Sequence, residues 1–579
     1  MKPSFSLNQA PFYYPGQEIR VRGSSSYIMS GEDFKNLEKG RVRLLFIAVL
    51  FAFFFFAIAA RLFEYTVLSE KSSVRVVTNP ATILDLKPAR ADITDRNGVV
   101  LATSLHTADL LSDNSLVDDV EQIATDLVEA LPSLDYDTVK NRLAKKSKRT
   151  NKGVTVTIMR DLTPKEQQRV HALGHPALQF MDGEKRVYPQ GNLFSHIIGE
   201  VGIDKKGLSG LEKSFDESIR NNKAPLKLSI DAGVQYAVRE ILAEEIQKYK
   251  AKNGTVIVMD VNTSEIISMV SLPDFDPNNP PGPNDDRRFN RASLGVYEFG
   301  SVLKVFNAAM ALDNNVVTLD EKIDSSELKF GNKVYRDDHP QKGPLNLSEV
   351  LAHSSNTASG RIALRAGSEK QREFFERIGF MEPLQLELPE KGNPILPKRW
   401  SDTNLITNSF GYGISVTPVH IITAISAMVN GGILRPATII ATDKPAKGVR
   451  VLSEDNSKKM RKMLRNVVIE GTGKLTNVAG YEVGGKTGTA EKVVNGKYDK
   501  KTVRATFVSV FPCSKPKYAM LVMLDEPKAE AGVRGRSAGA NAVPATKRIL
   551  EKIAPQLNVV PDFAITSARE AVLSVALNF

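Results

Sequence analysis

The sequence predicts an α+β protein with one N-terminal membrane-spanning helix and two domains outside the membrane. Three observations support this class. Residues 44–60 form an unbroken run of 17 apolar residues. Strand-like runs near 254–271 and 503–524 flank a long helical middle. Finally, the 579 residues of the chain exceed the roughly 250–300 residues at which single cores stop growing.

The apolar run predicts a helix that crosses a bilayer over residues 44–63, because a span needs about 20 residues. Lys39, Arg41 and Arg43 lie directly upstream, and the positive-inside rule therefore keeps the N-terminus in the cytoplasm and sends the rest of the chain across. Ala57-Ile58-Ala59 resembles a signal-peptidase site. The run is longer than the usual 7 to about 15 residues of a signal peptide, however, which favours an uncleaved anchor.

Composition and charge exclude some classes of function and leave others open. The formal net charge of +11 suits anionic surroundings, but the basic residues are scattered, so they indicate neither nucleic acid nor any other particular partner. Cys513 is the only cysteine, which excludes an intrachain disulfide and C-x-x-C motifs. His171 and His175 lack an H-E-x-x-H pattern. We therefore expect neither a metal nor a cofactor.

Changes in pattern along the chain predict its division into parts. These are a cytoplasmic tail over 1–43, the anchor over 44–63, a mixed α+β domain over 64–225, a larger domain over 226–555 and a C-terminal tail over 556–579. In the larger domain we expect strands at 255–259, 265–270, 503–511 and 518–524, a buried helix at 302–312 and a hairpin turn at 495–496. Strands that close around a helical middle predict a three-layer α+β fold.

Three short elements follow in order along the larger domain. They are S-x-x-K at Ser301–Lys304, S-x-N at Ser354–Asn356 and K-T-G-T at Lys486–Thr489. This set is typical of penicillin-binding proteins and serine β-lactamases. Each element alone is a weak signal, since other stretches match by chance: 326–329 and 514–517 for the first, and 112–114 for the second.

The context of Ser301 gives the first element chemical meaning. Ser301 follows Gly300 and opens the predicted buried helix, so Lys304, one turn later, lies on the same face and reaches its hydroxyl. A lysine takes a serine proton only if desolvation or a nearby cation lowers its pKa. Lys486 would supply that cation. Backbone N–H groups at the start of the helix would stabilise a tetrahedral oxyanion.

The other two elements fit a peptide substrate. Ser354 is suited to relay a proton to a leaving amine, and the Asn356 amide is suited to orient a peptide. Gly484 and Gly485 precede Lys486, which predicts an uncrowded strand edge along which a peptide pairs.

A rival motif overlaps the third element. Residues 480–487 read G-x-x-x-x-G-K-T, a literal Walker A sequence, and Asp525-Glu526 follow an apolar run as in a Walker B. A P-loop needs a strand before it and a helix after it. Residues 474–479 are too polar for a buried strand, and 491–502 predict a hairpin. An ATPase is therefore not favoured.

With these residues in place, the chain resembles a class B penicillin-binding protein over nearly its whole length, and most closely the division-specific FtsI type. The stretches that carry the resemblance include RADITDRNG at 90–98, GLSGLE at 207–212, 289–304, DHPQKGPLNLSEVLAHSSN at 338–356, GYGISVTP at 411–418 and 484–490. Phe299, Val302 and Leu303 depart from the residues that this family more commonly has around the nucleophile.

The resemblance implies an elongated, non-catalytic pedestal domain of the dimerisation type and a transpeptidase domain with an antiparallel sheet between helices. It implies a peptidoglycan D,D-transpeptidase in the inner membrane, in which Ser301 forms an acyl-enzyme and releases D-alanine. Lys304 would be the base, Ser354, Asn356 and Lys486 would complete the catalytic set, and Thr487, Gly488 and Thr489 would bind the substrate carboxylate and oxyanion.

The implied partners are peptidoglycan stem peptides, β-lactams, the membrane, a glycosyltransferase of the FtsW type and other division proteins. Four alternatives remain: an elongation-type transpeptidase, a β-lactamase, a β-lactam sensor and a catalytically silent division scaffold. The anchor and pedestal disfavour the β-lactamase, and the short tail over 1–43 disfavours the sensor. The intact set of Ser301, Lys304 and Lys486 disfavours a silent scaffold.

Overall fold

The computed structural model describes residues 19–20, 28–29, 31–63, 90–147, 153–529 and 535–563. The chain divides into two compact units, residues 1–85 and 86–579. The first unit contains β1 (Ile19–Arg20), β2 (Ile28–Met29) and the 33-residue helix α1 (Gly31–Phe63). Within the described residues, Lys39–Ala60 of α1 is the one span long and apolar enough to cross a membrane.

Helix α1 begins earlier than the predicted span of 44–63. The residues before the apolar run are largely charged, but Glu, Lys, Arg and Leu are good helix formers, so the helix extends beyond the part that needs lipid. The sequence pattern located the apolar segment and missed this polar first part.

The second unit begins with a sheet that contains both long and very short strands. Its described strands are β3 (Ile93–Thr94), β4 (Val100–Asp113), β5 (Thr155–Leu162), β6 (Leu178–Val187) and β7 (Leu226–Lys227). β4 pairs with β3, β5 and β6, all antiparallel, and β3 pairs with β7 in parallel. Thus β7, which lies at the start of the predicted larger domain, is hydrogen-bonded to a strand of the predicted domain that precedes it.

Short helices accompany this sheet. They are α2 (Val120–Ala130), α3 (Tyr136–Leu143), α4 (Pro164–His171), α5 (Ser195–Ile198), α6 (Gly210–Ser214) and α7 (Asp216–Asn221). Leu110 of β4 and Leu127 of α2 belong to a small apolar core at one end of the sheet. His175 Nε2 is paired with Asp126 Oδ2 at 2.8 Å.

A buried group of charges ties this domain together. The Glu212 side chain is fully buried, and its two oxygens accept hydrogen bonds from Arg90 Nε at 2.6 Å and Arg186 Nε at 2.7 Å. Arg90 also contacts Asp216 at 2.7 Å. Residues 90–98 and 207–212, which are far apart in the sequence, are joined here by a carboxylate that two guanidinium groups share.

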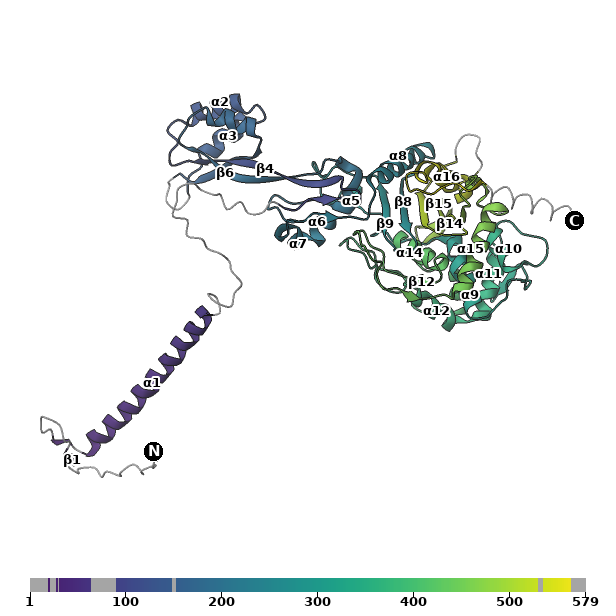
Figure 1. The fold of residues 1–579 in the computed structure, drawn as a ribbon, viewed down its shortest axis with the longest axis horizontal. Helices are drawn as coiled ribbons and strands as arrows, with labels where there is room; N and C mark the ends of the chain where they lie inside the picture. Colours follow the sequence, from purple (N-terminus) through teal and green to yellow (C-terminus); the bar gives the residue numbers. More distant parts are fainter. Residues whose placement is uncertain are drawn as a thin grey trace. The chain divides into compact units, whose positions relative to one another are not determined.

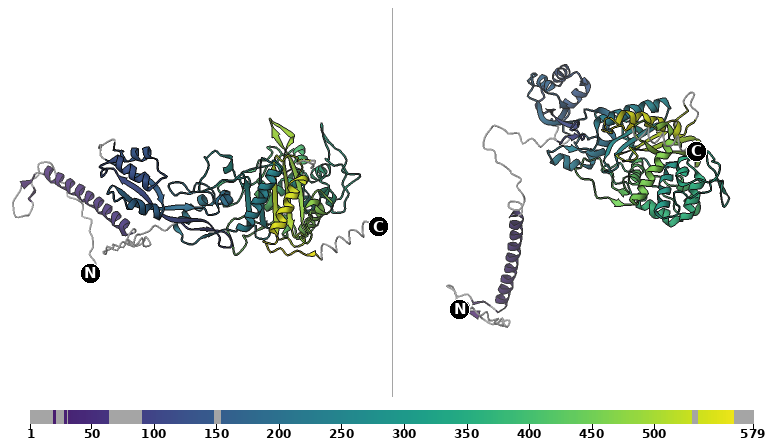
Figure 2. Two further views of the ribbon diagram at one scale, coloured as in Figure 1. Left: turned by 90° about the horizontal axis from the view of Figure 1, so that it is seen from above. Right: turned by 45° about the vertical axis from the view of Figure 1, so that its right-hand side comes forward.

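A second antiparallel sheet forms the centre of the larger domain (Figures 1 and 2). Its strand order is β14-β15-β16-β8-β9. The bounds are β8 (Asn253–Asp260), β9 (Ile266–Leu272), β14 (Gly484–Val494), β15 (Lys497–Phe511) and β16 (Tyr518–Asp525). The predicted strands are confirmed, and β14 and β15 meet in the predicted hairpin at Asn495-Gly496.

Helices cover both faces of this sheet, so the three-layer prediction is confirmed. Because successive strand residues point to opposite faces, Val256 and Val258 pack with α8 (Ala232–Lys248) and α16 (Ala542–Ile553), whereas Ile257 and Met259 pack in the larger core on the other side. The larger core holds α9 (Leu303–Asp313), α14 (Pro418–Val429) and α15 (Glu454–Ile469).

Further α-helices and short strands complete the helical middle of the domain. They are α10 (Leu347–Ala352), α11 (Asn356–Ala366), α12 (Ser368–Arg377), α13 (Asp402–Ser409) and the short strands β10 (Leu328–Phe330), β11 (Lys333–Tyr335), β12 (Ile433–Leu434) and β13 (Val449–Arg450). Trp400 packs against the core and donates to Gln371 Oε1 at 3.1 Å.

The buried charge group predicts the effect of one substitution. Glu212→Ala leaves two buried guanidinium groups without their shared carboxylate, so we expect the free energy of unfolding to fall by about 3–5 kcal/mol. Urea unfolding of the purified protein measures this change. Glu217→Ala, at an exposed position of α7, is the control and should change the stability by less than about 0.5 kcal/mol. Equal effects of the two substitutions would contradict the assignment.

Candidate active site

The nucleophile candidate lies in a tight turn before a buried helix. Gly300–Val302 form a 3-10 turn that continues into α9. Ser301 was predicted to be the first residue of the α-helix. In the structure it lies instead in the 3-10 turn that precedes the helix. Gly300 has φ +51°, and a Cβ there would lie 2.5 Å from the Thr489 carbonyl oxygen. Only glycine lets the turn approach β14 so closely.

Lys304 lies on α9 with only 1% of its surface exposed. Its Nζ is 2.9 Å from Ser301 Oγ, 3.1 Å from Ser354 Oγ and 2.7 Å from Asn356 Oδ1, and it also bonds the Ser354 carbonyl oxygen. Burial lowers the pKa of Lys304 to about 7, against the opposing influence of the Asp337 and Asp338 charges. Near neutral pH, much of this amine is therefore uncharged.

Hydrogen-bond counting shows what an uncharged Lys304 does. The Ser354 carbonyl and Asn356 Oδ1 are acceptors only, so they take the two protons of a neutral amine. The nitrogen lone pair then remains for a hydroxyl proton, and two hydroxyls lie within reach, Ser301 Oγ at 2.9 Å and Ser354 Oγ at 3.1 Å. Of these two residues, Ser301 lines the open cavity, so a neutral Lys304 is placed to accept its proton.

Lys486 approaches the same place from strand β14. It is fully buried, and its Nζ donates to Ser354 Oγ at 3.0 Å and to the Thr487 carbonyl at 3.0 Å. Burial first, and the positive charge of Lys304 second, hold the pKa of Lys486 well below the usual value of a lysine. One hydroxyl, that of Ser354, therefore connects the two amines.

Asp337 fixes the segment that carries Ser354 and Asn356. Its carboxylate accepts from Ser355 Oγ at 2.6 Å and from the Asn356 and Thr357 N–H groups at 2.6 and 2.9 Å. These N–H groups open α11, where a negative charge is favourable. Asp337 was not among the residues predicted from the sequence. In the sequence, the only indication of its role is that Asp337 and Asp338 form an adjacent pair of acids before the S-x-N element.

Strand β14 forms one edge of the sheet, and its outer groups face the site. Three contacts show which residues point outward: Lys486 Nζ bonds the Thr487 carbonyl, the Thr489 carbonyl lies against Gly300, and the Glu491 N–H donates to Tyr412 Oη at 3.2 Å. Residues two apart on a strand point the same way. The Thr489 N–H therefore also lies on this outer edge.

The prediction that Gly484 and Gly485 leave this edge uncrowded is wrong. A Cβ on Gly484 would lie 2.5 Å from Cys513 Sγ, and one on Gly485 would lie 2.4 Å from the Val508 carbonyl. These glycines allow close packing inside the domain, and the open part of the edge lies further along. Gly488 has a similar role, since its Cβ would lie 2.3 Å from the Phe299 carbonyl.

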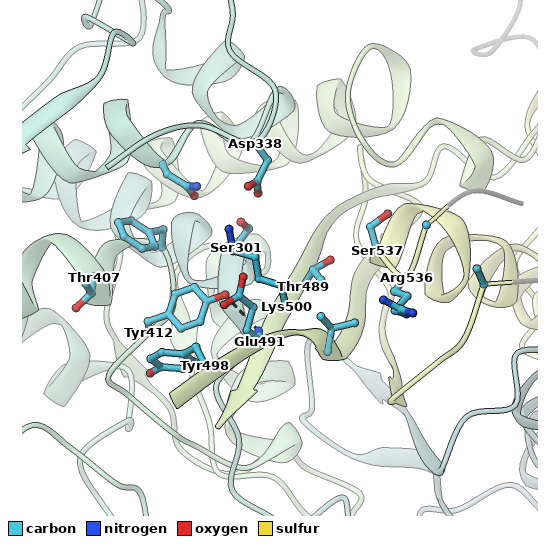
Figure 3. Close-up of a pocket in the computed structure, with 15 residues that line it drawn as sticks. Ser301, Asp338, Thr407, Tyr412, Thr489, Glu491, Tyr498, Lys500, Arg536 and Ser537 are labelled. Atoms are coloured by element: carbon cyan, nitrogen blue, oxygen red, sulfur yellow. Dashed lines mark hydrogen bonds between the residues drawn. The ribbon is translucent and has the colours of Figure 1, made fainter. Parts of the chain in front are cut away.

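A cavity of about 760 Å³ opens over Ser301. Figure 3 shows Tyr412 and Tyr498 on one side of Ser301, and Arg536 and Ser537 on the other. The lining carries both signs of charge, with Asp338 and Glu491 as acids and Lys500 and Arg536 as bases. Such a cavity suits a zwitterionic peptide.

The structure brings the predicted site residues together and separates the chance matches. Ser301, Lys304, Ser354, Asn356 and Lys486 form one hydrogen-bonded group. In contrast, the chance S-D-N match at 112–114 lies at the end of β4 in the first domain. The Walker A reading also fails, because its last residues lie inside β14 rather than at the start of a helix. In the described ranges, no group of three or more His, Cys, Asp or Glu side chains is placed to hold a metal ion.

The fold and this serine–lysine arrangement define an acyl-transfer enzyme of the serine type. Comparison with known families then identifies it further. Residues 254–551 match the penicillin binding protein transpeptidase domain, and residues 85–259 match the penicillin-binding protein dimerisation domain. The chain belongs to the penicillin-binding protein transpeptidases.

Individual relatives agree with this assignment. The chain is 36% identical to a probable peptidoglycan D,D-transpeptidase FtsI from Caulobacter vibrioides, over 81% of this chain and 82% of the relative. It is 32% identical to a probable peptidoglycan D,D-transpeptidase PenA from Neisseria meningitidis, over 91% and 94%. The crystal structure of penicillin-binding protein 3 from Mycobacterium tuberculosis, complexed with aztreonam, has the same fold, with a TM-score of 0.64 at 23% identity over 82% of this chain and 98% of that one.

The close approach of Gly300 to β14 predicts that Gly300→Ala slows acylation. The substitution places a Cβ against the Thr489 carbonyl at a positive φ, so the turn must move. We expect covalent labelling by a fluorescent penicillin to slow at least tenfold, or by about 1.4 kcal/mol or more in the barrier. Gly282→Ala, where a Cβ meets nothing within 4 Å, should label at the normal rate. An unchanged rate for Gly300→Ala would contradict the geometry.

Proposed function

We propose that this chain is a membrane-anchored peptidoglycan D,D-transpeptidase in which Ser301 forms the acyl-enzyme. The observation that carries the proposal is the buried Lys304 amine, 2.9 Å from Ser301 Oγ, with two carbonyl acceptors for its own protons. The names of the relatives, FtsI and PenA D,D-transpeptidases, support the same reaction. β-Lactams acylate the same serine in this proposal.

The first half-reaction forms the acyl-enzyme. Ser301 Oγ attacks the carbonyl carbon of the penultimate D-alanine of a stem peptide, and its proton passes to Lys304 Nζ. The electron pair of the carbonyl bond moves onto its oxygen, and the N–H groups of Ser301 and Thr489 stabilise that oxyanion. The position of Thr489 on the outer edge of β14 supports this role for its N–H.

The collapse of the tetrahedral intermediate breaks the C–N bond to the terminal D-alanine. The leaving nitrogen takes the proton of the Ser354 hydroxyl, and Lys304, whose Nζ lies 3.1 Å from Ser354 Oγ, replaces it with the proton taken from Ser301. An amine of a second stem peptide then attacks the ester, and its proton passes to the neutral Lys304. Ser301 leaves and takes that proton from Lys304, so the cycle closes without a net change in the enzyme.

Binding groups lie around this centre. Lys486 and the hydroxyls of Thr487 and Thr489 bind the terminal carboxylate of the donor peptide, and Asn356 orients the peptide through its amide. Gly488 allows the nucleophile turn to lie against the strand. The charge and the hydroxyl donors suit a carboxylate, and the position of Thr489 on the cavity wall supports the arrangement.

The proposal extends to the organisation of the chain. Residues 1–43 form a cytoplasmic tail, 44–63 the anchor in the inner membrane, 64–225 the pedestal, 226–555 the transpeptidase domain on the periplasmic side and 556–579 a C-terminal tail. The apolar span of α1 and its upstream Lys39, Arg41 and Arg43 support this orientation. The FtsI relatives support a role in septal wall synthesis, with a glycosyltransferase of the FtsW type and other division proteins as partners.

Labelling with fluorescent penicillin tests the nucleophile. The full chain in detergent should be labelled covalently, and Ser301→Ala should abolish the labelling, because among the described residues Ser301 has the one hydroxyl that both bonds Lys304 and lines the open cavity. Ser326→Ala, at the chance match in an exposed loop, is the control and should label normally. Persistent labelling of Ser301→Ala would remove Ser301 from the mechanism.

The products separate a transpeptidase from a sensor or a slow hydrolase. Incubation with a stem pentapeptide and an acceptor stem peptide should give a cross-linked dimer and free D-alanine in equal amounts. Free D-alanine with only hydrolysed donor would instead indicate a carboxypeptidase.

A further inference from the structure

The hydroxyl of Thr487 has a partner outside the three motifs. Thr472 Oγ1 lies 2.6 Å from Thr487 Oγ1. Thr472 follows the end of α15, and its N–H donates to the Ala352 carbonyl at 3.3 Å. Ala352 ends α10, directly before the turn that carries Ser354. Thr472 therefore contacts the K-T-G segment and the end of the helix that precedes the S-x-N segment.

The approach of this residue to α10 is close and fixed. Gly471 precedes it, and a Cβ at Gly471 would lie 2.4 Å from the Ala352 carbonyl. In the described part of the chain, the Thr472 hydroxyl has no hydrogen-bond partner besides Thr487 Oγ1. The Thr472 hydroxyl therefore makes a single hydrogen bond there, the one with Thr487.

Thr489 has an analogous contact. The Ala538 N–H donates to Thr489 Oγ1 at 3.0 Å. Thr487 and Thr489 are two apart on β14, so their side chains lie on the same face of the strand. The proposed function assigns the hydroxyls of Thr487 and Thr489 to carboxylate binding. Each of them therefore contacts one further polar group, the Thr472 hydroxyl or the Ala538 N–H.

Counting protons shows the consequence. A threonine hydroxyl has one proton and can accept through its oxygen at the same time. Because the Ala538 N–H can only donate, it leaves the Thr489 proton free for another acceptor. A carboxylate can only accept, so when Thr487 donates to it, the Thr472 hydroxyl must be the donor in the pair with Thr487.

We propose that Thr472 is a positioning residue, which holds the Thr487 hydroxyl as a hydrogen-bond donor toward the terminal carboxylate of the donor peptide. This inference rests on the proposed function. Thr472 does not touch the reacting atoms. It acts through Thr487, as the Ala538 N–H acts through Thr489.

Two substrates that differ only in the carboxylate test this inference. The first is an N-acyl-D-alanyl-thioglycolate, whose thiol leaving group carries a carboxylate, and the second is its methyl ester. Thr472→Val keeps the shape of the side chain and removes the hydroxyl. We expect kcat/KM for the carboxylate substrate to fall about tenfold, as is typical for a lost hydrogen bond to a charged group, and to change less than about twofold for the ester.

Two further variants separate positioning from structural effects. Thr472→Ser restores the hydroxyl and should recover kcat/KM for the carboxylate substrate to within about twofold. Thr423→Val removes a buried hydroxyl on α14 that has no hydrogen-bond partner among the residues the structure describes, and should affect neither substrate.

The outcomes distinguish this inference from the proposed function. If wild-type protein hydrolyses neither thioester and is not labelled by penicillin, the proposed function fails. If the wild type is active and Thr472→Val loses activity equally on both substrates, or on neither, the role of Thr472 is wrong. Failure of Thr472→Ser to recover activity would also overturn it.

Discussion

The site depends on one constraint, which is that the Lys304 amine is buried and cannot hold its proton firmly. Helix α9 is buried along nearly its whole length, so a lysine on it has no route to water. Desolvation disfavours the charged form, and the Ser354 carbonyl and Asn356 Oδ1 satisfy the two protons of the neutral form. What remains is a lone pair that can accept the proton of Ser301, whose Oγ lies 2.9 Å away. The same burial that stabilises the helical core thereby produces the base.

Other contacts hold three segments next to that amine, namely the nucleophile turn, the S-x-N segment and the K-T-G segment. Glycine at positions 300 and 488 lets the nucleophile turn lie against the edge strand. Asp337 fixes the start of α11, and with it Asn356. Thr472 lies between the S-x-N and K-T-G segments. Each contact joins residues far apart in the sequence, so the geometry belongs to the folded domain and not to any single motif.

Much of this architecture follows from local patterns in the sequence. The strand at 255–259 and the helix at 302–312 are visible because each is a continuous apolar run, and such runs mark elements that are buried on all sides. The motifs located Ser301, Lys304 and Lys486 because their chemistry restricts the residue type. Asp337 and Thr472 were not visible, since a carboxylate or hydroxyl that acts through tertiary contact leaves no spacing to recognise. The glycines at 484 and 485 were recognised but misinterpreted, because a glycine needed for an open edge looks the same in sequence as one needed for tight packing.

The pH dependence of acylation tests the central claim most directly. Only the neutral form of Lys304 accepts the Ser301 proton, and the neutral fraction rises with pH until the pKa is passed. With a β-lactam whose own charge is constant over the range, the second-order rate of acylation of the full chain should rise about tenfold per pH unit below its inflection. The inflection should lie at the lowered pKa of Lys304, about 7, with a level rate above it. A rate that keeps climbing to about pH 10, as for an ordinary solvated lysine, would contradict the account.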